Sequence, residues 1–310
     1  MSEALVAFAV GPVQSFIAEA RRTQDLYAGS RLLSEVMEAA LSAFSQHGAE
    51  VIYPVREIGT DQTAQRAHLS LPNKAFVRMP QERVEQACRA AEQAAKTRLR
   101  ELGRRAVEEF DGPRDEVWQA IWDRQMDHHL EVYWAAVPLR AEPHAYRDSC
   151  EELNRVFEAA KRTRAFAPVV ELGPKDSLSG ARSALHTARE RAREYWRRCA
   201  QLVGPQRLRA TGTERLDALG LIKRFGFGGT FPSTSTVASM PFVEQAASRA
   251  GRALREYREV IEGIRKFHRV SGDTVWPFDG DLLYEETLHE HRLQQDYGFT
   301  QDDLAKYSEE

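Results

Sequence analysis

The first 140 residues alternate between short apolar runs and longer amphipathic stretches. Residues 4–10 are all apolar and end at Gly11-Pro12, a pattern typical of a buried strand followed by a turn. Residues 14–27 then predict a helix, and a second apolar rhythm over residues 32–44 predicts another. The chain therefore begins with a strand and two helices.

Three further strands and a long helix follow in the same region. The predicted elements are a strand at 51–55, a polar loop at 60–66, a strand at 73–79, a helix at 81–110 and a buried strand at 130–137. The resulting order is strand, helix, helix, strand, strand, helix, strand. It predicts an α+β, ferredoxin-like split arrangement, in which a mixed sheet of four strands is backed by helices. With two helices in its first crossover, this arrangement is similar to the palm of nucleotide cyclases and polymerases, although a fold alone does not define a function.

The remainder of the chain is predicted to be mainly helical, with helices near 146–164, 183–202 and 243–268. Residues 225–236 are rich in Gly, Ser and Thr and predict an extended loop that is open to a ligand or another chain. We therefore expect two domains, a palm-like domain over 1–140 and a mainly helical domain over 141–310 with an acidic tail.

Charge is distributed unevenly, although the net charge is only −3. Residues 161–224 hold 15 Lys/Arg against 6 Asp/Glu, whereas residues 279–310 hold 10 acids against 2 bases. The basic stretch favours phosphate backbones, unless its arginines are simply the solvated faces of helices. The three cysteines form no pair, and we find neither a signal peptide nor an apolar run near 20 residues. These features predict a soluble, cytoplasmic protein.

Catalytic motifs are scarce. A palm that holds divalent metal ions needs paired carboxylates on a hairpin, but the expected hairpin at 51–79 has Asp61 alone in its turn region. Asp279-Gly280-Asp281 lies in the acidic tail, far from any predicted sheet, and Asp127-His128-His129 is interpreted as a helix-to-strand connection. P-loop and nucleophile-elbow motifs are both absent from the sequence. The residues by themselves favour binding or assembly over autonomous catalysis.

Six ordered segments carry a resemblance to a known family. They are GPVQSFIAEARRTQDLYAGSRLLSE at 11–35, LPNKAFVRMP at 71–80, EVYWAAVPL at 131–139, ERLDALGLIKR at 214–224, FPSTSTVASMPF at 231–242 and GDLLYEE at 280–286. Together they resemble the large subunit of type III CRISPR effector complexes, the Cas-ten family in its Cmr-two (type III-B) form. The resemblance implies a two-palm protein that assembles with other effector subunits, crRNA and target RNA. Its paired palms convert ATP into cyclic oligoadenylate.

The chain departs from that family pattern in three ways. We expect no HD nuclease domain before the first palm and no second palm after it, and the Gly-Gly-Asp-Asp motif does not occur. The family's Lys-Cys-Ser-Leu-Cys-Gly zinc element here reads KDSLSG at 175–180, so no zinc is expected. The chain thus looks like a first palm plus the following helical domain. Whether it is a natural half of a split protein, a truncated product or an excised fragment stays open.

Two sets of candidate residues follow from this resemblance. The first would form the non-metal wall of a shared ATP site, with magnesium or manganese held by a second palm: Ser15, Phe16, Arg22, Asp25, Gly29 and Ser30. Ser15 and Ser30 stand near predicted helix starts, which suit phosphate, whereas Phe16 is equally explained as core. The second set would contact RNA, nucleotide or a neighbouring subunit: Lys223, Arg224, Phe231, Pro232, Ser233 and Thr234.

Two other functions remain open at this point. One is a structural scaffold without catalytic activity, whose basic helices bind RNA or partner proteins. The other is a stand-alone cyclase-like homodimer, which the missing acidic pair disfavours. Whether the chain is half of a composite ATP site or a scaffold, we expect it to have no catalytic activity on its own.

Overall fold

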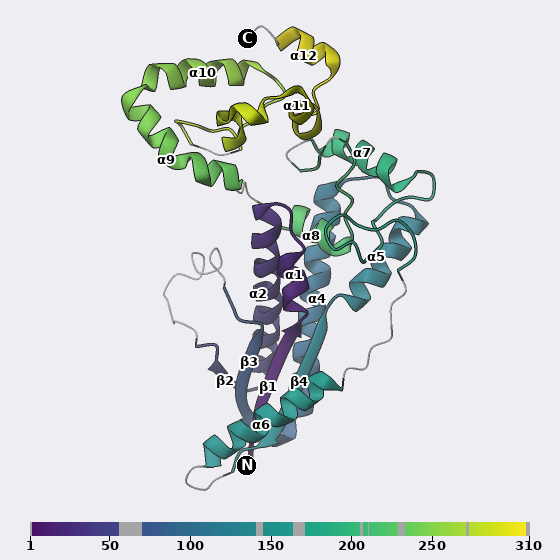
Figure 1. The fold of residues 1–310 in the computed structure, drawn as a ribbon. Coiled ribbons are helices and arrows are strands. Elements are labelled where there is room, and N and C mark those ends of the chain that lie inside the picture. The colour runs from purple at the N-terminus through teal and green to yellow at the C-terminus, as the bar shows by residue number, and fades with distance from the viewer. Residues whose placement is uncertain are drawn as a thin grey trace. The chain divides into compact units, whose positions relative to one another are not determined.

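The computed structural model describes residues 2–55, 70–140, 145–163, 171–204, 207–209, 211–228, 233–270 and 273–307 (Figure 1). The elements in chain order are β1 (Glu3–Gly11), α1 (Val13–Ala18), α2 (Thr23–Gln46), β2 (Glu50–Tyr53), β3 (Lys74–Pro80), η1 (Gln81–Arg83), α4 (Val84–Phe110), α5 (Glu116–His128), β4 (Glu131–Pro138), α6 (Ala145–Arg162), α7 (Ala192–Val203), α8 (Ala218–Phe225), α9 (Thr234–Arg249), α10 (Gly251–Gly263), η2 (Gly280–Leu283), η3 (Glu285–Thr287), α11 (Glu290–Tyr297) and α12 (Gln301–Tyr307).

The chain divides into two compact units whose segments interleave along the sequence. Unit 1 comprises Met1–Ala18, Tyr27–Arg105 and Asp123–Glu171, and unit 2 comprises Glu19–Leu26, Ala106–Trp122 and Leu172–Glu310. The unit borders fall inside α2, α4 and α5. The linear division after residue 140 stays a prediction from the sequence.

Unit 1 is built on a four-stranded sheet of order β2-β3-β1-β4, in which every neighbouring pair is antiparallel. The central strand β1 pairs on both sides, so that Val6 lies opposite Val77 of β3 and Ala136 of β4. The connections from β1 to β2 and from β3 to β4 each skip one strand, as expected for two interlocked crossovers. The predicted α+β class is therefore confirmed.

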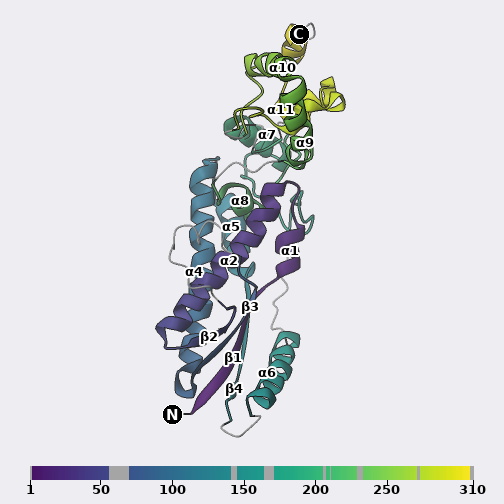
Figure 2. The same cartoon turned by 90° about the vertical axis from the view of Figure 1, so that its left-hand side faces the viewer.

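Helices cover both faces of this sheet, which explains why residues 4–10 are all apolar. On one face, Phe8 of β1 packs edge-on against Phe44 of α2, with ring centroids 5.3 Å apart. On the other face, Leu5 and Ala7 share a buried cluster with Phe157 of α6. Figure 2 shows α6 on one side of the sheet and α2 with α4 on the other.

Unit 2 is helical and has aromatic packing at its centre. Phe110 contacts both Trp196 of α7 and Phe225 of α8, at centroid distances of 5.7 and 5.2 Å. A separate buried cluster near the C-terminus includes Trp276, which stacks on Tyr257 of α10. Across the described residues of both units, none of the helices has the length and apolar character that crossing a bilayer requires.

The first predicted helix differs from the structure. Residues 14–27 are divided into α1 and α2, with a non-helical connection at 19–22, and α2 runs past Gly29 without a break. The backbone N–H groups of Arg21 and Arg22 both donate to the Asp25 carboxylate at 3.3 Å. The side chain of Asp25 thus stabilises the turn that precedes its own helix.

Two later helix predictions also require correction. Residues 183–191 are not helical, because Ala184 N–H donates to Pro174 and Leu185 N–H donates to Leu216 across the chain. The helix predicted at 243–268 is instead α9 and α10, and it begins at Thr234 within the expected loop. Ser233 caps α9 by accepting the N–H of Thr236 at 3.0 Å. Residues 229–232 of that loop lie outside the described residues.

Candidate functional site

Four predicted nucleotide-site residues belong to unit 1. Ser15 lies in α1, and Phe16 beside it is 1% exposed and packs edge-on against His129. Phe16 is therefore a core residue, which is one of the two interpretations that the sequence left open. Gly29 is buried within α2, whereas Ser30 is exposed on the same helix and is available for contact.

The other two residues, Arg22 and Asp25, belong to a buried ion-pair network in unit 2. Arg224 binds Asp25 through two hydrogen bonds, Nε to Oδ1 at 2.7 Å and Nη2 to Oδ2 at 2.8 Å. Glu214 lies 3.3 Å from Arg224 and accepts from Nη2 of Arg22 at 2.8 Å. The side chains of Asp25 and Arg224 have no exposed area. The network thus fixes the start of α2 to α8.

The electrostatics of this network are balanced, with two guanidinium groups against two carboxylates. Burial by itself would raise the pKa of Glu214, but Arg224 and Arg22 outweigh it and lower that pKa to about 2. Burial, together with repulsion from Arg224, lowers the pKa of Arg22. Because these charges are already paired, the residues hold the start of α2 against α8 instead of offering charge to a ligand.

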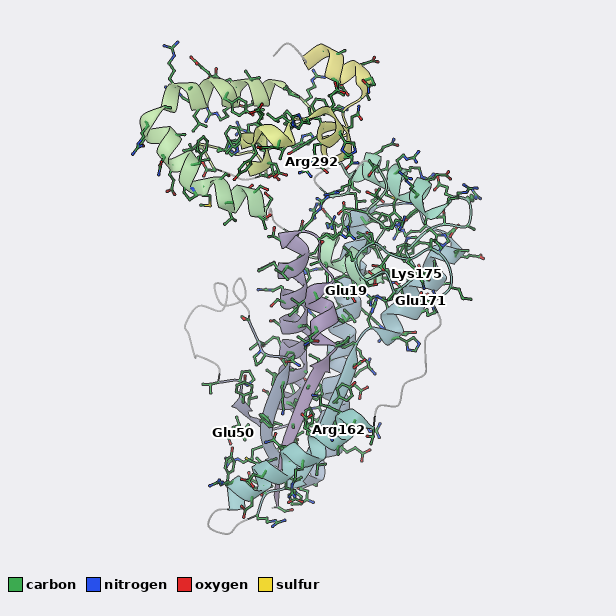
Figure 3. All side chains as sticks on the ribbon, in the orientation of Figure 1. Glu19, Glu50, Arg162, Glu171, Lys175 and Arg292 are labelled. Carbon is green, nitrogen blue, oxygen red and sulfur yellow. The ribbon has the colours of Figure 1, made fainter. Side chains whose placement is uncertain are left out.

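Lys223 is also buried, in a neighbouring network. Its Nζ donates to the backbone carbonyl of Glu19 at 2.8 Å, and burial lowers its pKa. Glu19, labelled in Figure 3, also pairs with Arg182, which in turn pairs with Asp217, the N-cap of α8. Both Lys223 and Arg224 are 0% exposed. The sequence placed them on a contact surface, and the structure instead uses them to hold α8, since buried cations need fixed partners.

The KDSLSG segment, which starts at Lys175 (Figure 3), is organised by hydrogen bonds. The buried carboxylate of Asp176 accepts the N–H groups of Leu178 and Ser179 at 2.9 and 2.6 Å, and the Ser179 hydroxyl at 2.5 Å. The Ser179 Oγ in turn accepts the N–H of Ala181 at 3.0 Å. Side-chain oxygens thus stabilise this turn.

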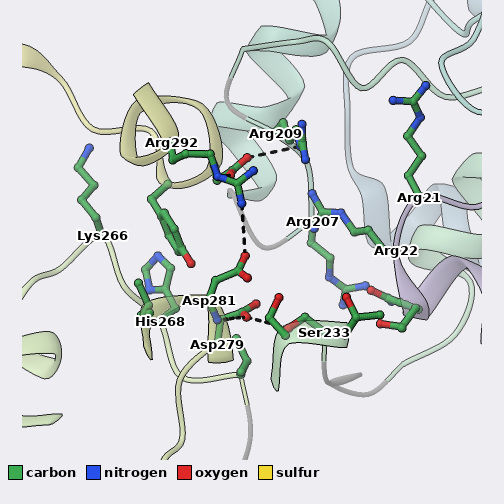
Figure 4. A pocket seen from close by; sticks show the side chains of 18 residues that line it. Arg21, Arg22, Arg207, Arg209, Ser233, Lys266, His268, Asp279, Asp281 and Arg292 are labelled. Atoms are coloured by element: carbon green, nitrogen blue, oxygen red, sulfur yellow. Dashed lines mark hydrogen bonds and ion pairs between the residues drawn. The ribbon is translucent and has the colours of Figure 1, made fainter. Parts of the chain in front are cut away.

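Unit 2 also contains a cavity of about 420 Å³ (Figure 4). Its lining joins Arg22 from the first predicted set with Ser233 and Thr234 from the second. The remaining two residues of the second set, Phe231 and Pro232, lie outside the described residues. The cavity therefore brings together residues that the sequence analysis had assigned to separate sites.

Several lining residues were not anticipated. Arg207 and Arg209 lie in the basic stretch, which gave a weak indication that they bind an anion. Arg292 and Asp281 come from the acidic tail, where the local sequence gives no indication that they share a cavity with those arginines. In the part of the chain that the structure describes, we find no group of three or more His, Cys, Asp or Glu side chains placed to hold a metal ion.

These features define an α+β protein with an antiparallel split sheet and a second, helical unit. Residues 5–104, which run from β1 into α4, match the family described as CRISPR-associated protein Cmr2, N-terminal. The match covers about a third of the chain, and over that region it supports a similarity to the N-terminal part of the large subunit of type III CRISPR effector complexes. No curated protein gives a significant match.

Proposed function

We propose that this chain supplies the non-metal half of a composite ATP site that makes cyclic oligoadenylate within a type III-B effector complex. The observation that carries the proposal is the sheet order β2-β3-β1-β4 with two helices in the first crossover, a ferredoxin-like order that is compatible with a palm. The family match, which covers that same region, supports it. Magnesium or manganese would be held by the acids of a second palm.

Within this site, we assign direct contacts to Ser15 and Ser30, and close backbone approach to Gly29. Ser30 is the best-founded member, because its side chain is exposed on α2. Arg22 and Asp25 act as positioning residues, since their ion pairs with Glu214 and Arg224 hold the first turn of α2 in place. Phe16 positions α1 through its packing against His129.

The test compares two serines of the same helix. The chain is mixed with a separately expressed second palm that bears Gly-Gly-Asp-Asp, and conversion of ATP is followed with magnesium or manganese present. Ser30→Ala should lower the rate about tenfold, the scale of removing one hydrogen bond to a charged phosphate. Ser42→Ala, an exposed change farther along α2, should leave it unchanged. Equal rates for the two variants would remove Ser30 from the site.

A scaffold role without nucleotide binding has its own support in α7. Arg193 and Arg197 are exposed one helical turn apart, and neither forms an ion pair with another described residue. Like charges at this spacing destabilise a helix, and an RNA backbone would relieve that repulsion.

RNA binding measured over a range of salt concentrations tests the scaffold role. Replacing Arg193 and Arg197 by Ala should weaken binding and reduce the salt slope by about 0.7 for each phosphate that is no longer neutralised. The matched control is the exposed pair Arg104 and Arg105 of α4, also replaced by Ala. If both double variants bind RNA as the unmodified chain does, α7 is a solvated helix.

A further inference from the structure

The cavity of unit 2 shares Arg22 with the residues proposed for the composite palm site, and the rest of its lining is distinct from them. Its volume of about 420 Å³ falls in the range of small-molecule and cofactor sites. Four segments of unit 2 contribute to it: the start of α2, residues 207–209, the start of α9, and residues 266–297. Six lysine or arginine side chains and three aspartates line it, so half of its 18 lining residues carry a charge.

One wall of the cavity carries three guanidinium groups with spare hydrogen-bond donors. The Asp296 carboxylate lies 3.5 Å from Arg209 and 3.2 Å from Arg292, so that one carboxylate serves two arginines. Arg21 is exposed, and its guanidinium pairs with no other described residue. Since each guanidinium has five N–H donors, this wall can bind several anionic oxygens.

A second wall, which adjoins Arg292, presents acceptors. Asp279 is fixed in place, because its Oδ1 accepts from the Ser233 hydroxyl at 2.7 Å and from the N–H of Asp281 at 3.0 Å. The Asp281 carboxylate lies 3.9 Å from Arg292, beyond hydrogen-bond distance, and its side chain is 28% exposed. In Figure 4 a dashed line joins Asp281 to Arg292 and marks this ion pair. Asp281 thus retains lone pairs for the donors of a ligand.

A ligand that satisfies both walls needs anionic oxygens at one end and hydroxyl or amino donors at the other. We propose that this cavity binds a nucleoside phosphate, with its phosphates on Arg21 and Arg209 and its ribose hydroxyls or base amino group on Asp281. This site is independent of the proposed palm function, because every lining residue belongs to unit 2 and no second palm or metal ion takes part.

The proposal predicts that substitutions in the two walls change the affinities for ATP and tripolyphosphate differently. Arg21→Ala removes a phosphate-binding group and should weaken binding of ATP and of inorganic tripolyphosphate alike, each by about tenfold. Asp281→Asn should weaken ATP by several-fold and leave tripolyphosphate unchanged or slightly tighter, since only the nucleoside end loses its acceptor and a negative charge disappears. Arg104→Ala, an exposed arginine of α4 outside the cavity, should change neither.

Isothermal titration calorimetry on the chain alone, in EDTA, measures these affinities. Titrants are ATP, tripolyphosphate, ribose 5-phosphate and adenosine, and thermal melts check that each variant is folded. Saturable ATP binding that is tighter than tripolyphosphate binding and is lost in Arg21→Ala is the expected result. Equal affinity for tripolyphosphate and ATP would reduce the site to a phosphate site. The proposal is overturned by absence of binding at millimolar ATP, or by equal effects of Arg21→Ala and Arg104→Ala.

Failure here can be told apart from failure of the palm proposal. The titration needs no metal ion or second chain, whereas ATP conversion in the mixture needs both. If conversion in the mixture survives Arg21→Ala, the two sites are separate.

Discussion

Arg224 is a fully buried cation whose ion pairs join the start of α2 to α8 in unit 2. Replacing Asp25 by Ala leaves this guanidinium without its bidentate partner. Glu214 remains 3.3 Å from Arg224, and we expect the free energy of unfolding to fall by about 3 kcal/mol, the lower end of the cost of removing one partner from a buried ion pair. Urea denaturation measures the change.

The control for this prediction is an exposed pair in α10. Arg252 and Glu256 lie 2.8 Å apart with side chains 87% and 60% exposed. Arg252→Ala should alter the free energy of unfolding by no more than about 0.5 kcal/mol. If Asp25→Ala is as mild as this control, the network is not a determinant of stability.

Glu214 gives the network a pH dependence. Its pKa is about 2 when folded, against an ordinary value of 4.5, because Arg224 and Arg22 favour the ionised form despite burial. Its stabilising contribution, about 3 kcal/mol, is present above pH 4.5 and is lost as the pH falls towards 2. The difference in unfolding free energy between the unmodified chain and Glu214→Gln should therefore shrink from pH 5 to pH 3. A constant difference would contradict this assignment.

The sequence drew attention to Arg22 and Asp25 through the family resemblance, as candidates for a nucleotide site. It did not reveal their role, since their partners Glu214 and Arg224 are almost 200 positions away. A similar separation explains why the burial of Lys223 was not predicted. Its position in a basic stretch suggests an exposed side chain, but in the structure it is buried and donates to the backbone carbonyl of Glu19. Only the fold decides which charged residues pair.

At the scale of elements, apolar periodicity predicted the four strands and the long helix α4 to within a few residues. It failed where tertiary hydrogen bonds replace helical ones, as at Ala184 and Leu185, whose N–H groups donate to distant carbonyls. It also missed that α9 begins inside the Gly/Ser/Thr-rich loop, where Ser233 and Asp279 bond across 46 positions. Local propensity carries no information about such partners.

Because η2 packs against the start of α9, we predict that a side chain at Gly280 destabilises the fold. A Cβ atom there would lie 2.5 Å from the backbone carbonyl of Ser235, so the backbone must shift. Gly280→Ala should lower the free energy of unfolding by about 1–3 kcal/mol. At Gly263, the last residue of α10, a Cβ meets nothing within 4 Å, and Ala should be neutral or slightly stabilising. Equal urea midpoints for the two variants would contradict this packing.

The turn at 175–180 predicts stability without zinc. Asp176 accepts three hydrogen bonds there, so Asp176→Ala should lower the free energy of unfolding by about 1–3 kcal/mol. EDTA and added zinc should both leave the melting temperature unchanged. Stoichiometric zinc in the purified protein, together with a lower melting temperature in EDTA, would show that this expectation is wrong.

For the whole molecule, the order of strands and helices in the sequence was sufficient to predict the α+β class and a four-stranded split sheet. The predicted mixed sheet was wrong, because every neighbouring pair of strands is antiparallel. The interleaving of the two units was not predictable, because α2, α4 and α5 each contribute to both. A periodic pattern defines one continuous helix and does not indicate which compact unit each of its turns joins.

The central claim is that this chain completes an ATP site only with a second palm. The most direct measurement is conversion of ATP, with magnesium or manganese, by this chain alone, by the Gly-Gly-Asp-Asp palm alone, and by their mixture. We predict cyclic oligoadenylate from the mixture and none from this chain. Product from this chain alone would contradict the claim, and silence in all three would favour the scaffold role.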